Sequence, residues 1–236
     1  MGRQGVLRQG GYQSKGTTMK FRSTITKLAA VVIAGALSTG MTAAPAQAAS
    51  GDPGEKSLAA VLTADGNGTF DRNWYDYDIV TQAVLGVLAA KPNSNVKLLT
   101  DGSVALTTFI PNDRAFRLLA HDLTGKSYKA EKTVFNKLVA KLGINAIEKV
   151  LLYHVVPGGP ILAKDALQAN GAKLATALPG ASITVRVKGK NVPTIILRDR
   201  DHNDYDPRVN PWATDINEGN KQVAHGITRV LRPINL

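Results

Sequence analysis

The hydrophobic pattern changes its period along this chain, and this change limits the fold more than any other feature of the sequence. Up to about residue 167, apolar residues recur mainly every three to four positions, which is typical of amphipathic helices. From Lys173 onward they alternate, as at Ile183, Val185 and Val187, which is typical of strands. Helices that precede strands predict an α+β fold, with a mostly helical first half packed on a sheet formed mainly by the second half.

The same pattern places the individual elements. Helices are predicted at 79–90, from residue 112 to about 119, at 131–142, at 144–154 and at 161–167, and strands at 104–110, 183–187, 194–197 and 223–231. Asp78 and Asn112 precede two of these helices, and their short side chains can accept hydrogen bonds from free N–H groups of the first turn. Gly143 separates two helices, and Gly226 in the last strand indicates a bulge or a close approach.

A leader is predicted at the start of the chain. Basic residues after Met19 are followed by an apolar core from Leu28 to Leu37 and by small residues at Ala46 and Ala48. This order is typical of a secretory signal peptide, and its apolar core is too short to span a bilayer stably. We therefore expect a true start at Met19, cleavage after Ala48, and a secreted protein with no stable membrane span.

Three parts are expected along the chain: a leader at 1–48, an N-terminal arm at 49–78, and one domain at 79–236. The aromatic residues of the arm need a surface to cover, so the arm should pack on the domain. The chain has no cysteine, so a secreted domain of this kind must be stabilised by its core, and it is long enough to bury one.

The leader changes the charge balance. The full chain has 29 Lys and Arg against 18 Asp and Glu, which gives a net charge of +11. Six of these basic residues and none of the acidic ones lie in residues 1–48, so the remainder has a net charge of +5. This modest surplus favours anionic cell-wall polymers or polysaccharides. No basic face interleaved with aromatic residues is seen, so nucleic-acid binding is not expected.

Three stretches of the chain occur in a fixed order. The first runs from Thr107 to Phe116, the second contains Tyr153 and His154, and the third runs from Val223 to Pro233. In this order and spacing they resemble the fasciclin-like (fasciclin I) domain family over roughly residues 79–233, in a secreted, single-domain form of bacterial type. The matching signature residues are Thr107, Phe109, Pro111, Asn112, Ala115, Phe116, His225, Ile227, Val230, Leu231 and Pro233.

The resemblance implies the fasciclin-like fold, in which helices pack on a β-sheet wedge. The chain departs from the family pattern in its third stretch. Lys221-Gln222 stands where Asn-Gly is usual, and Thr228 stands where Asp is usual.

Tyr153 and His154 are the first candidate binding residues. The resemblance implies binding, because the corresponding pair is implicated in receptor binding in animal members of the family. The alternative is structural: a buried His154 bonds the backbone of the last strand through its ring nitrogens, and Tyr153 packs beside it. His225 has the same two alternatives. No third ligand accompanies the two histidines at a helical or strand spacing, which argues against a metal pair.

An acidic segment from Asp199 to Asp206 is the second candidate. Asp199, Asp201 and Asn203 reproduce the start of a calcium loop, because side chains at alternate positions can converge on one hard cation. Asp204 and Asp206 complete the candidate ligand set. The pattern then departs from such a loop, which has Gly at its sixth position and Glu at its twelfth. A solvated acidic loop is the alternative, and Ca²⁺ is the one cofactor considered.

Known catalytic motifs do not occur in this sequence. There is no Gly-x-Ser-x-Gly, no His-Glu-x-x-His, no phosphate-binding glycine loop and no dinucleotide fingerprint. We expect a secreted, non-catalytic adhesion or interaction module that binds cell-surface, cell-wall or extracellular-matrix components, either protein or polysaccharide. Two alternatives stay open: a calcium-dependent matrix or cell-wall protein that uses the acidic segment, and a polysaccharide-active enzyme that uses its acids.

Overall fold

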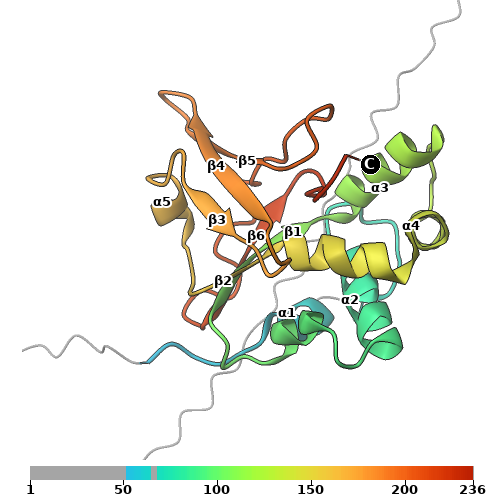
Figure 1. Ribbon diagram of the computed structural model, residues 1–236, viewed down its shortest axis with the longest axis horizontal. Coiled ribbons are helices and arrows are strands. Elements are labelled where there is room, and N and C mark those ends of the chain that lie inside the picture. Colours follow the sequence, from blue (N-terminus) through green and yellow to red (C-terminus); the bar gives the residue numbers. More distant parts are fainter. Residues whose placement is uncertain (1–51, 65–67, 236) are drawn as a thin grey trace, which may run out of the picture. The chain divides into compact units, whose positions relative to one another are not determined.

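The computed structural model describes residues 52–64 and 68–235, all of them within the compact unit Ser50–Leu236. The predicted leader, its start at Met19 and its cleavage after Ala48 lie outside these residues. The described chain has an α+β fold (Figure 1). Its elements are, in order, α1 (Leu58–Ala64), α2 (Asp78–Ala90), the 3-10 helix η2 (Asn95–Thr100), β1 (Leu106–Pro111), α3 (Asp113–Thr124), α4 (Glu131–Tyr153), β2 (Val155–Pro157), α5 (Ala163–Ala166), β3 (Lys173–Ala175), β4 (Ser182–Lys188), β5 (Thr194–Arg198) and β6 (Gln222–Ile227).

Two of the three predicted helix-boundary residues, Asn112 and Gly143, have the predicted role. Asn112 precedes α3, and its side chain accepts a hydrogen bond from Ala115 N–H at 3.0 Å, so the predicted cap is confirmed. Asp78 is instead the first residue of α2, and Tyr77 at the cap position makes no capping bond through its side chain. Gly143 has φ 73° and ψ 164° and breaks α4 into the two helices that the pattern predicts.

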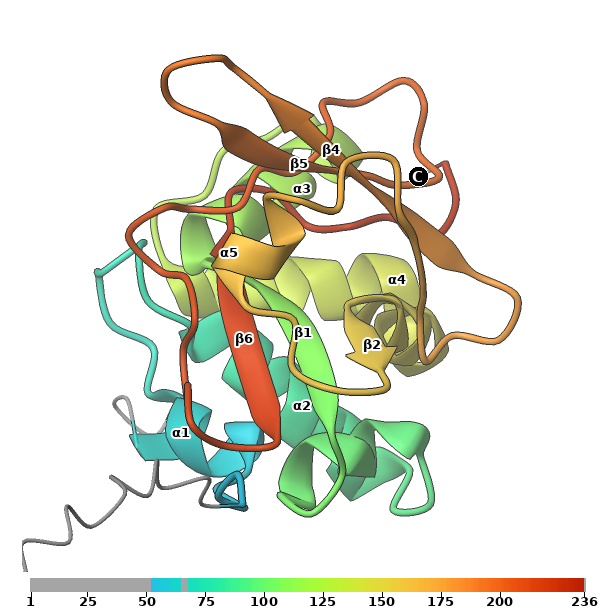
Figure 2. The same cartoon turned by 90° about the vertical axis from the view of Figure 1, so that its left-hand side faces the viewer.

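The strands form two three-stranded sheets. In the first, of order β2-β1-β6, β1 pairs antiparallel with β2 and parallel with β6, which places Phe109 opposite His225. In the second, of order β3-β4-β5, all neighbours are antiparallel. Figure 2 shows β1 and β6 side by side at the centre, with the β4–β5 hairpin at one end and α1 at the other. Strand β1 (residues 106–111) comes from the first half of the chain, and it lies between two strands from the second half.

The last strand is shorter than predicted, because β6 ends at Ile227 and not at 231. Beyond Ile227 the backbone donors leave the sheet: Thr228 N–H bonds Arg208 O at 3.0 Å, and Leu231 N–H bonds the ring of His154. Four short elements, α1, η2, β2 and β3, were not predicted, because three to seven residues are too few to establish a period.

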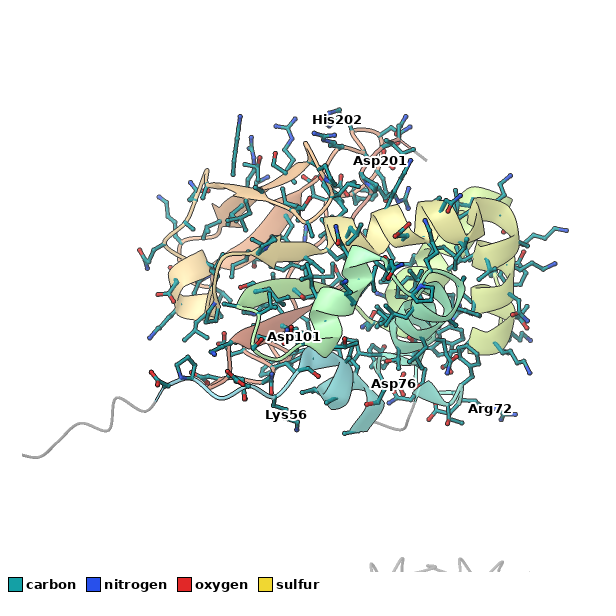
Figure 3. The ribbon with its side chains drawn as sticks, turned by 60° about the horizontal axis from the view of Figure 1, so that its bottom comes forward. Lys56, Arg72, Asp76, Asp101, Asp201 and His202 are labelled. Carbon is teal, nitrogen blue, oxygen red and sulfur yellow. The ribbon has the colours of Figure 1, made fainter. Side chains whose placement is uncertain are left out.

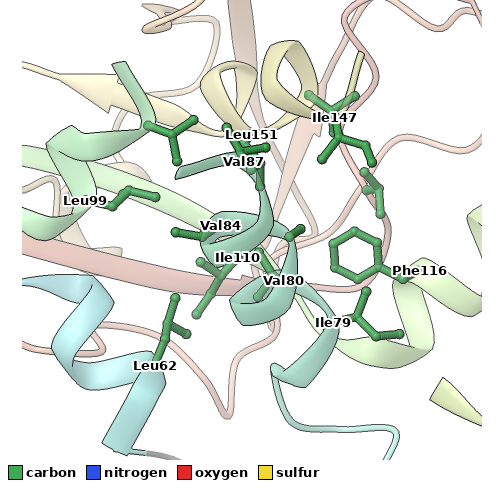
Figure 4. Close-up of a cluster of buried hydrophobic side chains, with 14 of the residues drawn as sticks. Leu62, Ile79, Val80, Val84, Val87, Leu99, Ile110, Phe116, Ile147 and Leu151 are labelled. Atoms are coloured by element: carbon green, nitrogen blue, oxygen red, sulfur yellow. The ribbon is translucent and has the colours of Figure 1, made fainter. Parts of the chain in front are cut away.

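Buried apolar side chains fill both sides of β1. The larger cluster joins α1 to α4 with β1, and Figure 4 shows Phe116 with Ile79 and Ile147 around it. The smaller cluster joins β4 and β5 to Phe109 and Tyr153. Phe70, Trp74 and Tyr77 from the predicted arm pack against the larger cluster, as expected. Among the described residues, no helix is both long enough and apolar enough to cross a membrane.

Gly226 provides a test of this packing. A Cβ atom at Gly226 would lie 2.6 Å from Tyr77 Oη and 2.8 Å from Ala213 Cβ, so the close approach predicted at this glycine is confirmed. Overpacking of this kind costs about 1–3 kcal/mol, and we expect Gly226→Ala to lower the free energy of unfolding by that amount in urea titrations.

Gly86→Ala is the control, because nothing lies within 4 Å of its added Cβ atom. In helix α2 this change should stabilise by up to about 1 kcal/mol. Equal stability of Gly226→Ala and the native protein would contradict the packing described.

Candidate functional site

Tyr153 and His154 lie at the end of α4 and are buried, with exposed fractions of 0% and 4%. Tyr153 Oη donates a hydrogen bond to Ser182 O at 2.9 Å, which connects α4 to β4. His154 Nδ1 lies 2.7 Å from Val150 O, and Leu231 N–H donates to His154 Nε2 at 2.9 Å. Because Nε2 accepts, the proton must be on Nδ1, and the imidazole is neutral. One ring nitrogen therefore contacts the C-terminal segment, while the other stays within its own helix.

Burial controls the titration of both side chains. It lowers the pKa of His154 from 6.5 to about 4, although the bond to Val150 O acts in the opposite direction. Burial also raises the pKa of Tyr153 to about 12. Neither ring presents a polar atom to solvent, so a partner that contacts this face meets other side chains first.

His225 lies on β6 and is 2% exposed. Its Nε2 lies 2.8 Å from Ile161 O, and its Nδ1 accepts a hydrogen bond from Asp215 N–H at 3.3 Å. Its ring stacks on Phe109 with centroids 5.9 Å apart, and burial lowers its pKa. Both ring nitrogens bond the backbone, as they do in His154.

The three signature stretches meet at one place in the fold. Phe109 N–H bonds His154 O at 3.0 Å, and the Thr107 hydroxyl accepts from Ile161 N–H at 2.7 Å. The signature residues contribute mainly to pairing, capping and packing: Thr107, Phe109 and Pro111 in β1, Asn112 at the cap of α3, Ala115 and Phe116 in the core, His225 and Ile227 in β6, and Val230, Leu231 and Pro233 in the buried C-terminal segment. The structure thus gives these residues contacts that hold the domain together.

The acidic segment after β5 is folded against Arg232. Asp199 uses both of its oxygens, which accept from Asp201 N–H at 3.0 Å and from Arg232 N–H at 2.8 Å. Asp201 does the same with Asn203 N–H and the Arg232 guanidinium. Burial raises the pKa of Asp199 to about 6.

Two arginines supply positive charge to this segment. Arg232 is 4% exposed, and its guanidinium contacts Asp122, Asp201 and Asp204 at 2.5, 3.1 and 3.0 Å. Arg229 contacts Asp204 at 3.2 Å. Guanidinium groups therefore already neutralise two of the side chains that the calcium hypothesis needs, Asp201 and Asp204. Ca²⁺ at Asp199, Asp201, Asn203, Asp204 and Asp206 stays a prediction.

Sequence reasoning missed several polar residues in the buried part of the structure. Gln222 is 0% exposed and donates to the carbonyls of Leu98, Asp101 and Val104, which ties η2 and the loop after it to β6. It replaces a residue of the usual family pattern, and that departure was the one available signal. Asp113 and Glu131 were also missed, because acidic residues in the first turn of a helix are ordinary.

The lowered pKa of His154 predicts a loss of stability in acid. Below pH 6.5 the unfolded chain protonates this histidine, while the folded chain does so only near pH 4. The stability contribution is therefore lost as the pH falls from about 6.5 to about 4, by on the order of 3 kcal/mol. We expect His154→Asn to flatten this part of the stability–pH curve in urea titrations. His121→Asn, on the exposed side of α3, should leave the slope unchanged. An unchanged slope in His154→Asn would contradict the assignment.

The buried guanidinium of Arg232 predicts a second effect. Arg232→Met leaves Asp201, which is 2% exposed, without its partner. Loss of one member of a buried ion pair costs about 3–5 kcal/mol, and denaturant unfolding should show a decrease of that size. Arg208→Met is the matched control, because Arg208 is exposed and outside the ion pairs of the described residues. A decrease below about 1 kcal/mol, which is ordinary for an exposed pair, would show that the cluster is solvated.

Comparisons with known proteins identify the family of the chain. Among solved structures, the chain is similar to that of a FAS1 domain pair from the insect cell adhesion molecule fasciclin I, at 15% identity and a TM-score of 0.42. The likeness covers 64% of this chain and 44% of that one, so the chain spans less than half of that structure. No curated protein matches the chain. The model of the Fasciclin domain family matches residues 84–233, which is more than half of the sequence, and the chain belongs to this family.

Proposed function

We propose that this protein is a secreted, non-catalytic adhesion module that binds a cell-surface, cell-wall or extracellular-matrix component, either protein or polysaccharide. Membership of the Fasciclin domain family supports a general interaction role. One observation on this chain carries the proposal further. Large apolar side chains are exposed on the segments between β4 and β6, and two of them, Val192 and Trp212, lie at or next to one groove.

The exposed side chains in these segments are unusually large. Val192 is 79% exposed, Tyr205 is 78% exposed and Trp212 is 92% exposed. An exposed tryptophan leaves one of the largest apolar side-chain surfaces in contact with water, which is unfavourable. Tryptophan and tyrosine are also the residues that contribute most often to binding energy at interfaces. Val192 and Trp212 therefore mark the surface that we assign to the partner.

A groove of about 240 Å³ adjoins this surface. It lies between α5, the start of β5 and the segment before β6, and its lining is mainly apolar. The lining residues are Ala163, Leu167, Val192, Pro193, Thr194, Ile195, Val209, Pro211 and Thr214. Val192 belongs to the groove itself, and Pro211 is the neighbour of Trp212. The groove and the exposed Trp212 ring together provide the apolar centre that a binding site needs.

A second exposed aromatic side chain, Tyr205, lies beyond the other end of β5. The Arg229 guanidinium lies 5.3 Å from the centroid of its ring. Arg186, Lys188 and Arg198 line a separate depression of about 210 Å³ together with Asp201, Asp204 and Asp206. A flat ring suits both sugar faces and protein side chains, and mixed charges suit a polar partner.

Binding by the Trp212 variant tests this proposal. Full-length protein is titrated against its own cell envelope, against purified cell-wall polysaccharide and against immobilised matrix proteins. We expect Trp212→Ala to weaken saturable binding at least about tenfold, as loss of a central aromatic contact does. Tyr75→Ala is the matched control, since Tyr75 is 72% exposed but precedes α2. Equal binding by Trp212→Ala and the native protein would place the interaction elsewhere.

A further inference from the structure

Three carboxylates meet where the helices of the first half begin. Asp76 precedes α2, Asp113 is the first residue of α3, and Glu131 is the first residue of α4. One carboxylate oxygen from each of them lies within 4.8 Å of those of the other two. Asp113 is 0% exposed and Glu131 is 1% exposed. This acidic cluster is separate from the segment after β5, because Figure 3 shows Asp76 and Asp201 on opposite sides of the domain.

One oxygen of each buried carboxylate is fixed by the backbone. Asp113 Oδ1 accepts from Ile79 N–H at 3.0 Å, and Glu131 Oε2 accepts from Asp71 N–H at 2.7 Å. The other oxygens, Asp113 Oδ2 and Glu131 Oε1, are buried without a hydrogen-bond partner among the described residues. Buried polar atoms are almost always satisfied in folded proteins, so these two oxygens indicate a missing ligand.

The charges around the cluster do not balance. Within residues 52–64 and 68–235, no ion pair joins a basic side chain to Asp113 or Glu131. The N-termini of α2, α3 and α4 contribute roughly half a positive charge each, which together is less than the charge of the two buried carboxylates, Asp113 and Glu131. Asp71, Asp76 and Asp78 form a second, overlapping group of carboxylates. The region therefore needs protons or a cation.

We propose that Asp76, Asp113 and Glu131 form the centre of a calcium-binding site, with Asp71 and Asp78 beside it. Calcium binds oxygen ligands at about 2.3–2.6 Å, so ligands on opposite sides of the ion lie roughly 5 Å apart. The oxygens of this cluster lie within 4.8 Å of one another, so all of them can reach one ion. Calcium accepts flexible coordination by carboxylates, whereas magnesium demands near-ideal octahedral geometry, which favours calcium for ligands that come from three separate segments. The exposed Asp71 provides a polar route from solvent to the buried ligands.

A calcium ion here would connect segments that are far apart in the sequence. Its ligands come from the segment before α2 and from the first turns of α3 and α4, so it would fix the relative positions of three helices. It would be a structural ion, and none of its ligands is among the side chains assigned to the partner surface.

Calcium titration of the full-length protein tests the proposal. Protein freed of metal with a chelator is titrated with CaCl₂ by calorimetry, and its melting temperature is measured with Ca²⁺, with Mg²⁺ and with chelator. We expect one ion per chain, a melting temperature raised by Ca²⁺ more than by Mg²⁺, and release of protons on binding. Asp113→Asn and Glu131→Gln should each weaken Ca²⁺ binding at least about tenfold, because each removes a charged ligand.

Both variants should still fold. An amide at either position still accepts from Ile79 N–H or Asp71 N–H, and it adds a donor for the neighbouring carboxylates. Asp206→Asn is the control in the other acidic segment and should bind Ca²⁺ as the native protein does. Three results would each overturn the proposal: no Ca²⁺ binding by the native protein, unchanged binding in both Asp113→Asn and Glu131→Gln, or loss of binding in Asp206→Asn alone. The first would mean that shared protons neutralise the cluster.

Discussion

The parallel pairing of β1 with β6 is the constraint on which the rest of this domain depends. The two strands come from 106–111 and 222–227, so more than a hundred residues must fold between them. Parallel neighbours need a crossover connection, and here the crossover contains α3, α4 and the whole second sheet. His154 closes this arrangement, since its carbonyl bonds β1 and its ring bonds the segment after β6. The ring contact requires a neutral imidazole, which burial favours.

Buried carboxylates have different surroundings at two places in the domain. After β5, Arg232 lies among Asp122, Asp201 and Asp204, so the guanidinium compensates the acids it touches. At the start of the helices, Asp113 and Glu131 meet Asp76 without such a partner for either buried group. Desolvation makes a buried carboxylate without a compensating charge unfavourable. The proposed calcium site therefore lies at the starts of the helices and not in the acidic segment after β5.

Local signals in the sequence predicted much of the fold. Asn112 caps α3, Gly143 divides α4, and Gly226 permits a close approach, because each of these roles depends on backbone geometry within a few residues. The end of β6 was placed too late, because Thr228 and Leu231 find their partners in distant segments. Helix α1 was missed for a related reason: Leu58 and Leu62 alone do not establish a period, and their burial depends on the larger cluster.

The sequence by itself determined the class of fold, the order of the elements and membership of the Fasciclin domain family, because period, caps and signature residues are properties of neighbouring positions. Only the tertiary structure decided which polar groups are buried. His154 and His225 became backbone-bonded core residues, Arg232 became the partner of the acidic segment, and Asp113 and Glu131 became the centre of a carboxylate cluster. The cost of burying a polar group depends on contacts between residues tens to hundreds of positions apart, and no local pattern encodes those contacts.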